Sequence, residues 1–202
     1  MDGIFDTDNE DNPLRDWNAI YIPYCTGDVH AGDATDVDVP GIGAPAGQSF
    51  VGYRNIGLYL DRIIPTFPSV TKVLLTGSSA GGVGVAYNYD RVAQAFCPRP
   101  VMLVDDAGPP MSDEYVAPCL QKRWRELWGI DGTLPVGCPE CGAPDGGGVA
   151  YYTTTSPSIS GRPAPDLQRG RQRHPAVLRV RRERLRQPRW RPALLDVRAA
   201  LP

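Results

Sequence analysis

The chain has 202 residues, a formal net charge of −2, and contains 42% hydrophobic and 22% charged residues. This composition is typical of one globular domain and excludes a wholly disordered or fibrous protein. No apolar run approaches the roughly eighteen residues of a membrane span. The acidic first twenty residues also lack the pattern of a secretory signal, so the sequence predicts neither.

The near-zero net charge conceals two unlike segments. Residues 1–160 contain nine Lys and Arg against twenty Asp and Glu, which makes them acidic. Residues 161–202 contain twelve Arg, three acidic residues and six Pro, and no Ser, Thr or Lys. Such a residue set is typical of a GC-rich gene read out of frame, so we expect a frameshifted or disordered tail. The alternatives are a real basic arm and a tail that forms part of the fold. Binding of nucleic acid by such an arm is a minor alternative, because the single Trp190 offers little base stacking.

The predicted elements of the acidic segment alternate between strands and helices. Residues 17–24 alternate β-forming side chains and predict a buried strand, and residues 29–47 predict a surface loop. Residues 48–64 have helical apolar spacing that ends at Pro65. Residues 70–76 predict a strand, residues 80–96 a helix, and residues 101–104 a second strand. Residues 120–130 predict a further helix, and residues 149–155 predict a truncated strand. This order predicts an α/β fold with a mostly parallel sheet and flanking helices.

The sequence Gly77-Ser78-Ser79-Ala80-Gly81 matches the G-x-S-x-G pattern of a nucleophile elbow. It lies between a predicted strand and a predicted helix, which is the context that this motif requires. Gly77 and Gly81 supply the small flanks of a strained turn, and Ser79 is the candidate nucleophile. The N–H of Ala80, at the start of the helix, is a candidate oxyanion donor. The alternative is a glycine-rich turn in which Ser79 only caps a helix.

A serine nucleophile needs a base, and the chain has only His30 and His174. His30 precedes the serine, whereas α/β-hydrolases have the order Ser, acid, His. We therefore expect His30 to line a pocket or hold a loop. His174 lies in the Arg-rich tail. We accordingly expect the 202-residue chain to turn over esters poorly.

Two acidic residues and one cysteine pair complete the candidate residues. Asp105 and Asp106 end a predicted strand, so their carboxylates should emerge at the same sheet edge as the serine. They are candidates for a pocket role or a turn cap, and less so for a catalytic acid. Cys138 and Cys141 form a lone C-x-x-C, which favours a disulfide over a zinc site. The sequence predicts no metal site.

Three stretches resemble the pectin acetylesterase family, which includes the Notum carboxylesterases. They are Trp17-Asn18 through Tyr24-Cys25-Thr26-Gly27-Asp28, then Gly32 with Phe50 to Asn55, and then Leu74 to Gly84, followed by Asn88 to Ala93. The resemblance covers residues 12–150. It implies an α/β-hydrolase-like sheet, secretion, and a Ser, Asp, His triad that removes acyl groups without a metal or cofactor.

Carried over residue by residue, the resemblance places only the nucleophile, at Ser79. Family members have a glycine-rich oxyanion loop before the point that corresponds to Met1, and their triad Asp and His follow the point where this sequence becomes rich in Arg and Pro. The resemblance therefore implies a partial esterase domain over residues 1–160, incomplete at both ends. Its expected substrates are acylated small molecules, polysaccharides or proteins. The alternative function is a non-catalytic secreted binding domain on a hydrolase scaffold.

Overall fold

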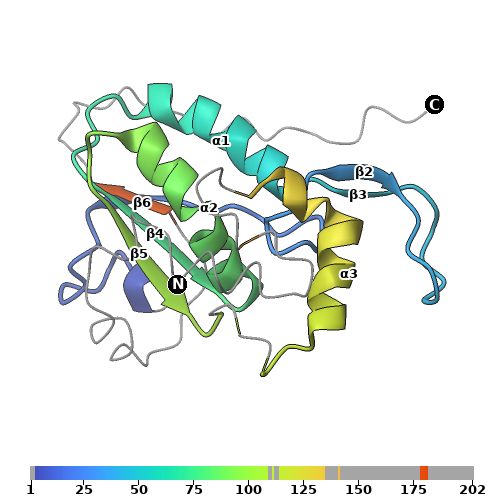
Figure 1. Ribbon diagram of the computed structural model, residues 1–202. Helices are drawn as coiled ribbons and strands as arrows, with labels where there is room; N and C mark the ends of the chain where they lie inside the picture. The colour runs from blue at the N-terminus through green and yellow to red at the C-terminus, as the bar shows by residue number, and fades with distance from the viewer. Residues whose placement is uncertain (1–2, 109–110, 112–113, 135–140, 142–177, 182–202) are drawn as a thin grey trace, which may run out of the picture.

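The computed structural model describes residues 3–108, 111, 114–134, 141 and 178–181. Its main sheet has four strands in the order β1-β6-β4-β5 (Figure 1), with β4 and β5 parallel and β6 antiparallel to both of its neighbours. Strands β1, β4 and β5 therefore run in the same direction. The strands are β1 (Trp17–Ile20), β4 (Val73–Ser78), β5 (Val101–Asp106) and β6 (Leu178–Arg181).

Strand β6 departs from the expectation of a tail outside the fold. Its residues Leu178–Arg181 pair with β1 on one side and with β4 on the other, so that the described sheet is mixed rather than mostly parallel. The alternation of Leu, Arg, Val and Arg fits a strand, but the Arg and Pro of its flanks outweigh this short pattern in the sequence. The remaining residues of 161–202 lie outside the described residues, and their frameshift stays a prediction.

A second, two-stranded sheet occupies the segment that was expected to be a loop. Strands β2 (Ala34–Val37) and β3 (Gln48–Phe50) pair antiparallel. The prediction of an uninterrupted surface loop over residues 29–47 is therefore wrong, as is the helix start at Gln48. Both strands are short and only half-buried. They consequently lack the apolar alternation that marks a strand in a sequence.

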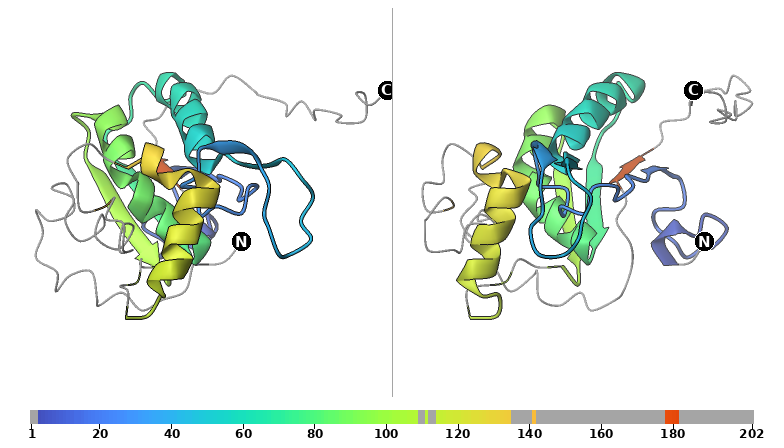
Figure 2. Two further views of the ribbon diagram at one scale, coloured as in Figure 1. Left: turned by 45° about the vertical axis from the view of Figure 1, so that its right-hand side comes forward. Right: turned by 90° about the vertical axis from the view of Figure 1, so that its right-hand side faces the viewer.

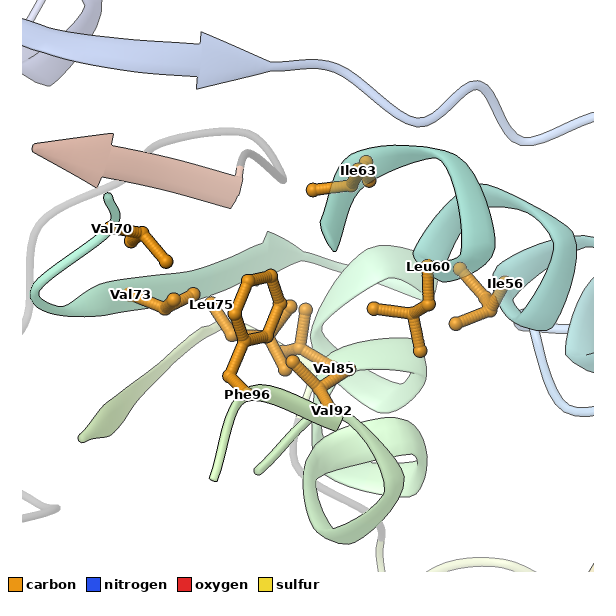
Figure 3. Close-up of a cluster of buried hydrophobic side chains, with 9 residues drawn as sticks. All are labelled: Ile56, Leu60, Ile63, Val70, Val73, Leu75, Val85, Val92 and Phe96. Carbon is orange, nitrogen blue, oxygen red and sulfur yellow. The ribbon is translucent and has the colours of Figure 1, made fainter. Parts of the chain in front are cut away.

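The main core lies between the sheet and two helices, α1 (Gly52–Thr66) and α2 (Ala80–Phe96). Helix α2 has the bounds that the sequence predicts, and α1 continues through Pro65 in its last turn. Apolar residues four and three positions apart lie on one face of α1, and this face packs against the buried residues of β4 and α2 (Figure 3). The cluster consists of Ile56, Leu60, Ile63, Val70, Val73, Leu75, Val85, Val92 and Phe96.

Helix α3 (Pro118–Trp128) lies beyond the carboxyl ends of β4 and β5, apart from the α1 and α2 pair (Figure 2). It ends at Gly129, whose φ of 65° is the left-handed C-cap conformation that glycine adopts readily. The indole rings of Trp124 and Trp128 stack with centroids 5.5 Å apart. Trp128 belongs to a second buried cluster with Ala31, Tyr87, Ile130 and Cys141. This cluster attaches α3 to the loop after β1 and to α2.

Candidate active site

Ser79 stands at the turn between β4 and α2. Its φ of 56° and ψ of −120° place an L-residue in a sparsely populated region of backbone conformation. The turn is held because the Ser79 N–H donates to the Asp106 carbonyl at 3.0 Å, and the Ser79 carbonyl accepts from Gly82 N at 2.9 Å. The side chain is exposed and makes no capping hydrogen bond to α2. These features are typical of a nucleophile elbow and disfavour a simple helix cap.

Close backbone approaches explain the glycines around the turn. A Cβ at Gly77 would collide with the Gly81 carbonyl and lie 2.9 Å from Gly82 N. A Cβ at Gly108 would collide with the Ser79 carbonyl and lie 2.8 Å from the Gly82 Cα. The turn can therefore close only while these positions carry no side chain. The sequence motif identifies Gly77, whereas Gly108 is recognised only once β5 lies beside β4.

Ser79 borders a cavity of about 360 Å³ between the start of α2 and helix α3. The stacked pair Trp124 and Trp128 lies across the cavity from the α2 side. The walls are mostly apolar, with Gln121 and Arg125 as the polar side chains besides the serine. The lining residues are Val29, Ser79, Ala80, Val83, Ala107, Gly108, Met111, Val116, Gln121, Trp124, Arg125, Trp128 and Ile130. The cavity has the size and polarity of a small-molecule site.

Ala80 is the first residue of α2 and lines the same cavity. Its N–H has no acceptor within the helix, since the first N–H groups of any helix lack one. The positive end of the helix dipole reinforces this donor. An N–H group at this point is suited to binding a negative charge that develops on a carbonyl oxygen next to Ser79.

Asp105 and Asp106 lie at the sheet edge where the sequence places them. Their register partners on β4 are Gly77 and Ser78. The carboxylate of Asp105 lies against Gly82 and accepts the Gly108 N–H at 3.2 Å. Burial, with a smaller effect of the Asp106 charge, raises the pKa of Asp105 to about 6, although the Gly108 hydrogen bond opposes the shift. Asp105 thus contacts the backbone that supports the elbow.

The raised pKa of Asp105 predicts a pH dependence of stability. The folded state binds this proton more tightly than the unfolded chain, whose aspartates titrate near 3.8. This contribution is therefore full below about pH 4 and is lost as the pH rises through 6. We expect it to amount to roughly 1 kcal/mol, because solvent screens a half-buried carboxyl. Urea unfolding at pH 4.5 and 7.5 measures it.

Asp105→Asn keeps an oxygen for Gly108 and should remove this part of the pH dependence. Asp61→Asn, on the exposed side of α1, is the matched control for the change of charge. An Asp105→Asn variant whose stability changed with pH as much as that of the original chain would contradict the assignment.

His30 does not lie among the residues that line the Ser79 cavity. It lines a separate cavity of about 50 Å³ on the other side of α2, together with Gly84 and Asn88. Its ring packs against Tyr24 with centroids 5.1 Å apart. Burial lowers the pKa of His30, and the charge of Asp28 opposes this only in part. The structure gives His30 a pocket-lining and loop position, while His174 lies outside the described residues.

Two polar residues that the sequence reasoning missed hold the loop after β1. Asp28 is fully buried and accepts hydrogen bonds from Thr26 Oγ1 at 2.9 Å, His30 N at 3.1 Å and Gly52 N at 2.7 Å. Asn88 is 2% exposed and donates from Nδ2 to the carbonyl oxygens of His30 and Gly84, both at 2.9 Å. Both residues lie in the stretches that carry the family resemblance, and this was the only sign in the sequence that could have identified them.

The cysteines show no metal-site geometry in the part of the chain that the structure describes. Cys25, Cys97 and Cys119 are free thiols at the surface, and Cys141 is buried and disulfide-bonded. No group of three or more His, Cys, Asp and Glu side chains gathers among the described residues. Cys138 lies outside them, so its predicted disulfide stays a prediction.

A strand, a strained serine turn and a helix, followed by a parallel strand, are the arrangement of an α/β protein of the hydrolase type. The family model for pectinacetylesterases matches residues 1–134, and the chain belongs to this family. Its curated relatives include palmitoleoyl-protein carboxylesterase NOTUM of Homo sapiens, 38% identical over 95 residues, and that of Mus musculus, 39% identical over 95 residues. The NOTUM protein of Schmidtea mediterranea is 34% identical over 95 residues.

These matches cover 46% of the chain and only 17–18% of each relative. The matched part is thus less than a fifth of the length of the curated relatives. No solved structure gives a significant match. The names of the family and of these relatives are those of ester hydrolases.

Proposed function

We propose that the protein is a serine carboxylesterase with an α/β-hydrolase-like fold, in which Ser79 attacks the carbonyl carbon of an acyl ester. The alcohol leaves as the acyl-serine forms, and water then releases the acid. The Ala80 N–H would stabilise the negative charge on the carbonyl oxygen. The single observation that carries this proposal is the strained, exposed serine at the mouth of an apolar cavity.

The cavity favours an acyl group longer than acetate. A cavity of about 150 Å³ is enough for benzene, so one of about 360 Å³ has room for roughly ten carbon atoms or more. The apolar walls and the indoles of Trp124 and Trp128 suit an alkyl chain. The name of these relatives refers to a palmitoleoyl group on a protein, and a fatty acyl ester of a protein or small molecule is the substrate class that we propose. An acetylated polysaccharide would leave most of this cavity empty.

The described residues do not supply a base to the serine. Neither His30 nor the Asp105 carboxylate has a hydrogen bond to Ser79 among the described residues. We therefore expect the 202-residue chain to hydrolyse esters far below a few turnovers per second. Faster turnover would mean that His30 or His174 is a working base, and His→Ala at each would identify it.

The apolar cavity beside Ser79 also favours a second candidate function, a non-catalytic domain that binds acyl chains. We propose that the protein is extracellular, and both candidates are compatible with this localisation. No helix in the described part of the chain is long and apolar enough to cross a membrane. The two candidates differ in whether Ser79 forms a covalent bond.

A decyl fluorophosphonate probe separates the two candidates. The purified chain is incubated with excess probe, digested, and searched for the adduct by mass spectrometry. An esterase site gives a slow, stoichiometric adduct on Ser79, because the turn and the Ala80 N–H favour the phosphonyl adduct even without a base. A binding domain gives no adduct but still binds decanoate, which the fluorescence of Trp124 and Trp128 reports.

A further inference from the structure

Two consecutive residues after β1 have left-handed backbone conformations. The φ angles of Val29 and His30 are 50° and 59°. This region is unfavourable for any L-residue with a Cβ and most unfavourable for a β-branched one, so Val29 is an outlier. A glycine would adopt the same turn without strain. A valine at this position therefore indicates a use for its side chain.

Hydrogen bonds from three side chains hold this turn. The Val29 N–H donates to Tyr24 Oη at 3.0 Å, and the His30 N–H donates to the buried Asp28 carboxylate at 3.1 Å. The His30 carbonyl accepts from Asn88 Nδ2 at 2.9 Å. The surrounding structure thus determines both residues and offsets the cost of their conformation.

The turn is fixed to the helix that carries the serine. Asn88 belongs to α2, whose first residue directly follows Ser79. Gly84, one turn before Asn88, has no side chain to hold the loop away. A Cβ there would lie 2.8 Å from the His30 Cδ2 and 3.0 Å from the Val29 carbonyl oxygen. Val29 therefore keeps a constant position relative to the serine.

The two side chains of the turn enter different cavities. His30 lines the small cavity on one side of α2, whereas Val29 lines the 360 Å³ cavity that contains Ser79. We propose that Val29 is a specificity-determining residue whose side chain limits the length of acyl chain that this cavity accepts. This inference rests on the proposed acyl cavity and goes beyond it by assigning chain-length selection to one rigidly held wall residue.

The test uses the full 202-residue chain and two fatty acids, octanoate and tetradecanoate, each below its micellar concentration. Quenching of Trp124 and Trp128 gives the Kd of each acid, and the ratio of the octanoate Kd to the tetradecanoate Kd measures chain-length preference. Val29→Gly removes both the side chain that lines the cavity and the unfavourable φ. We therefore expect the ratio to rise at least threefold with no loss of thermal stability. Val29→Phe fills the cavity and should lower the ratio at least tenfold.

Val37→Phe, on β2 and outside the cavity lining, is the matched control and should leave the ratio unchanged. Circular dichroism confirms that each variant is folded, and Val29→Gly keeps the test decisive if Val29→Phe fails to fold. If the original chain binds the acids and both Val29 variants give the same ratio of Kd values as the original chain, this inference alone is overturned. Failure of the original chain to bind either acid overturns the acyl cavity, and this inference with it.

Discussion

Replacing Ser79 by alanine is expected to abolish the fluorophosphonate adduct. In a complete family member that carries the same motif and a base, the same change should lower hydrolysis of p-nitrophenyl esters by roughly a thousandfold or more. The substitution removes only the Oγ atom that would form the acyl bond. It leaves the φ of 56° and the backbone hydrogen bonds of the turn in place, so the thermal unfolding midpoint should not change. Mass spectrometry of the labelled protein and initial rates of p-nitrophenol release measure the two effects.

The preceding residue provides a matched control. Ser78 is the last residue of β4 and has Asp106 as its register partner on β5. It is also absent from the cavity lining. Ser78→Ala should therefore keep both the adduct and the residual rate. An adduct on Ser78, or a full rate in the corresponding alanine variant of the complete family member, would refute Ser79 as the nucleophile.

Gly77→Ala is expected to have the largest effect on stability. The new methyl group would collide with the Gly81 carbonyl and lie 2.9 Å from Gly82 N. Both neighbours are backbone atoms of α2, so relief requires a shift of the whole helix against β4. We expect a loss of roughly 3 kcal/mol or more in the free energy of unfolding, together with the loss of Ser79 labelling. Urea denaturation followed by circular dichroism measures this change.

Gly132→Ala is the corresponding control, because a Cβ at Gly132 has no neighbour within 4 Å. This substitution should change the free energy of unfolding by less than about 1 kcal/mol, and we expect a small increase rather than a decrease. If Gly77→Ala were as mild as Gly132→Ala, the close approach of β4 and α2 at the turn would be wrong.

The sequence alone determined the parts of the fold that depend on residues adjacent in the chain. Helix α2 begins and ends at Ala80 and Phe96, as its apolar spacing and flanking prolines predict. The turn at Ser79 was recognisable because its requirements are local, with small residues two positions before and after the serine. The positions of Asp105 and Asp106 at the same sheet edge follow from strand direction alone, and their register confirms them.

Only the tertiary structure decided which distant residues complete the site. Asn88 and His30 are 58 residues apart, yet their hydrogen bond fixes the turn that carries Val29. Gly108 fits against Ser79 because β5 lies beside β4, and the cavity is lined jointly by the start of α2 and by α3. Such contacts leave no periodic pattern in a sequence, since each depends on the placement of two elements rather than on the preference of one. The turn at Ser79 was therefore readable from the chain, whereas the shape of the cavity beside it depended on packing.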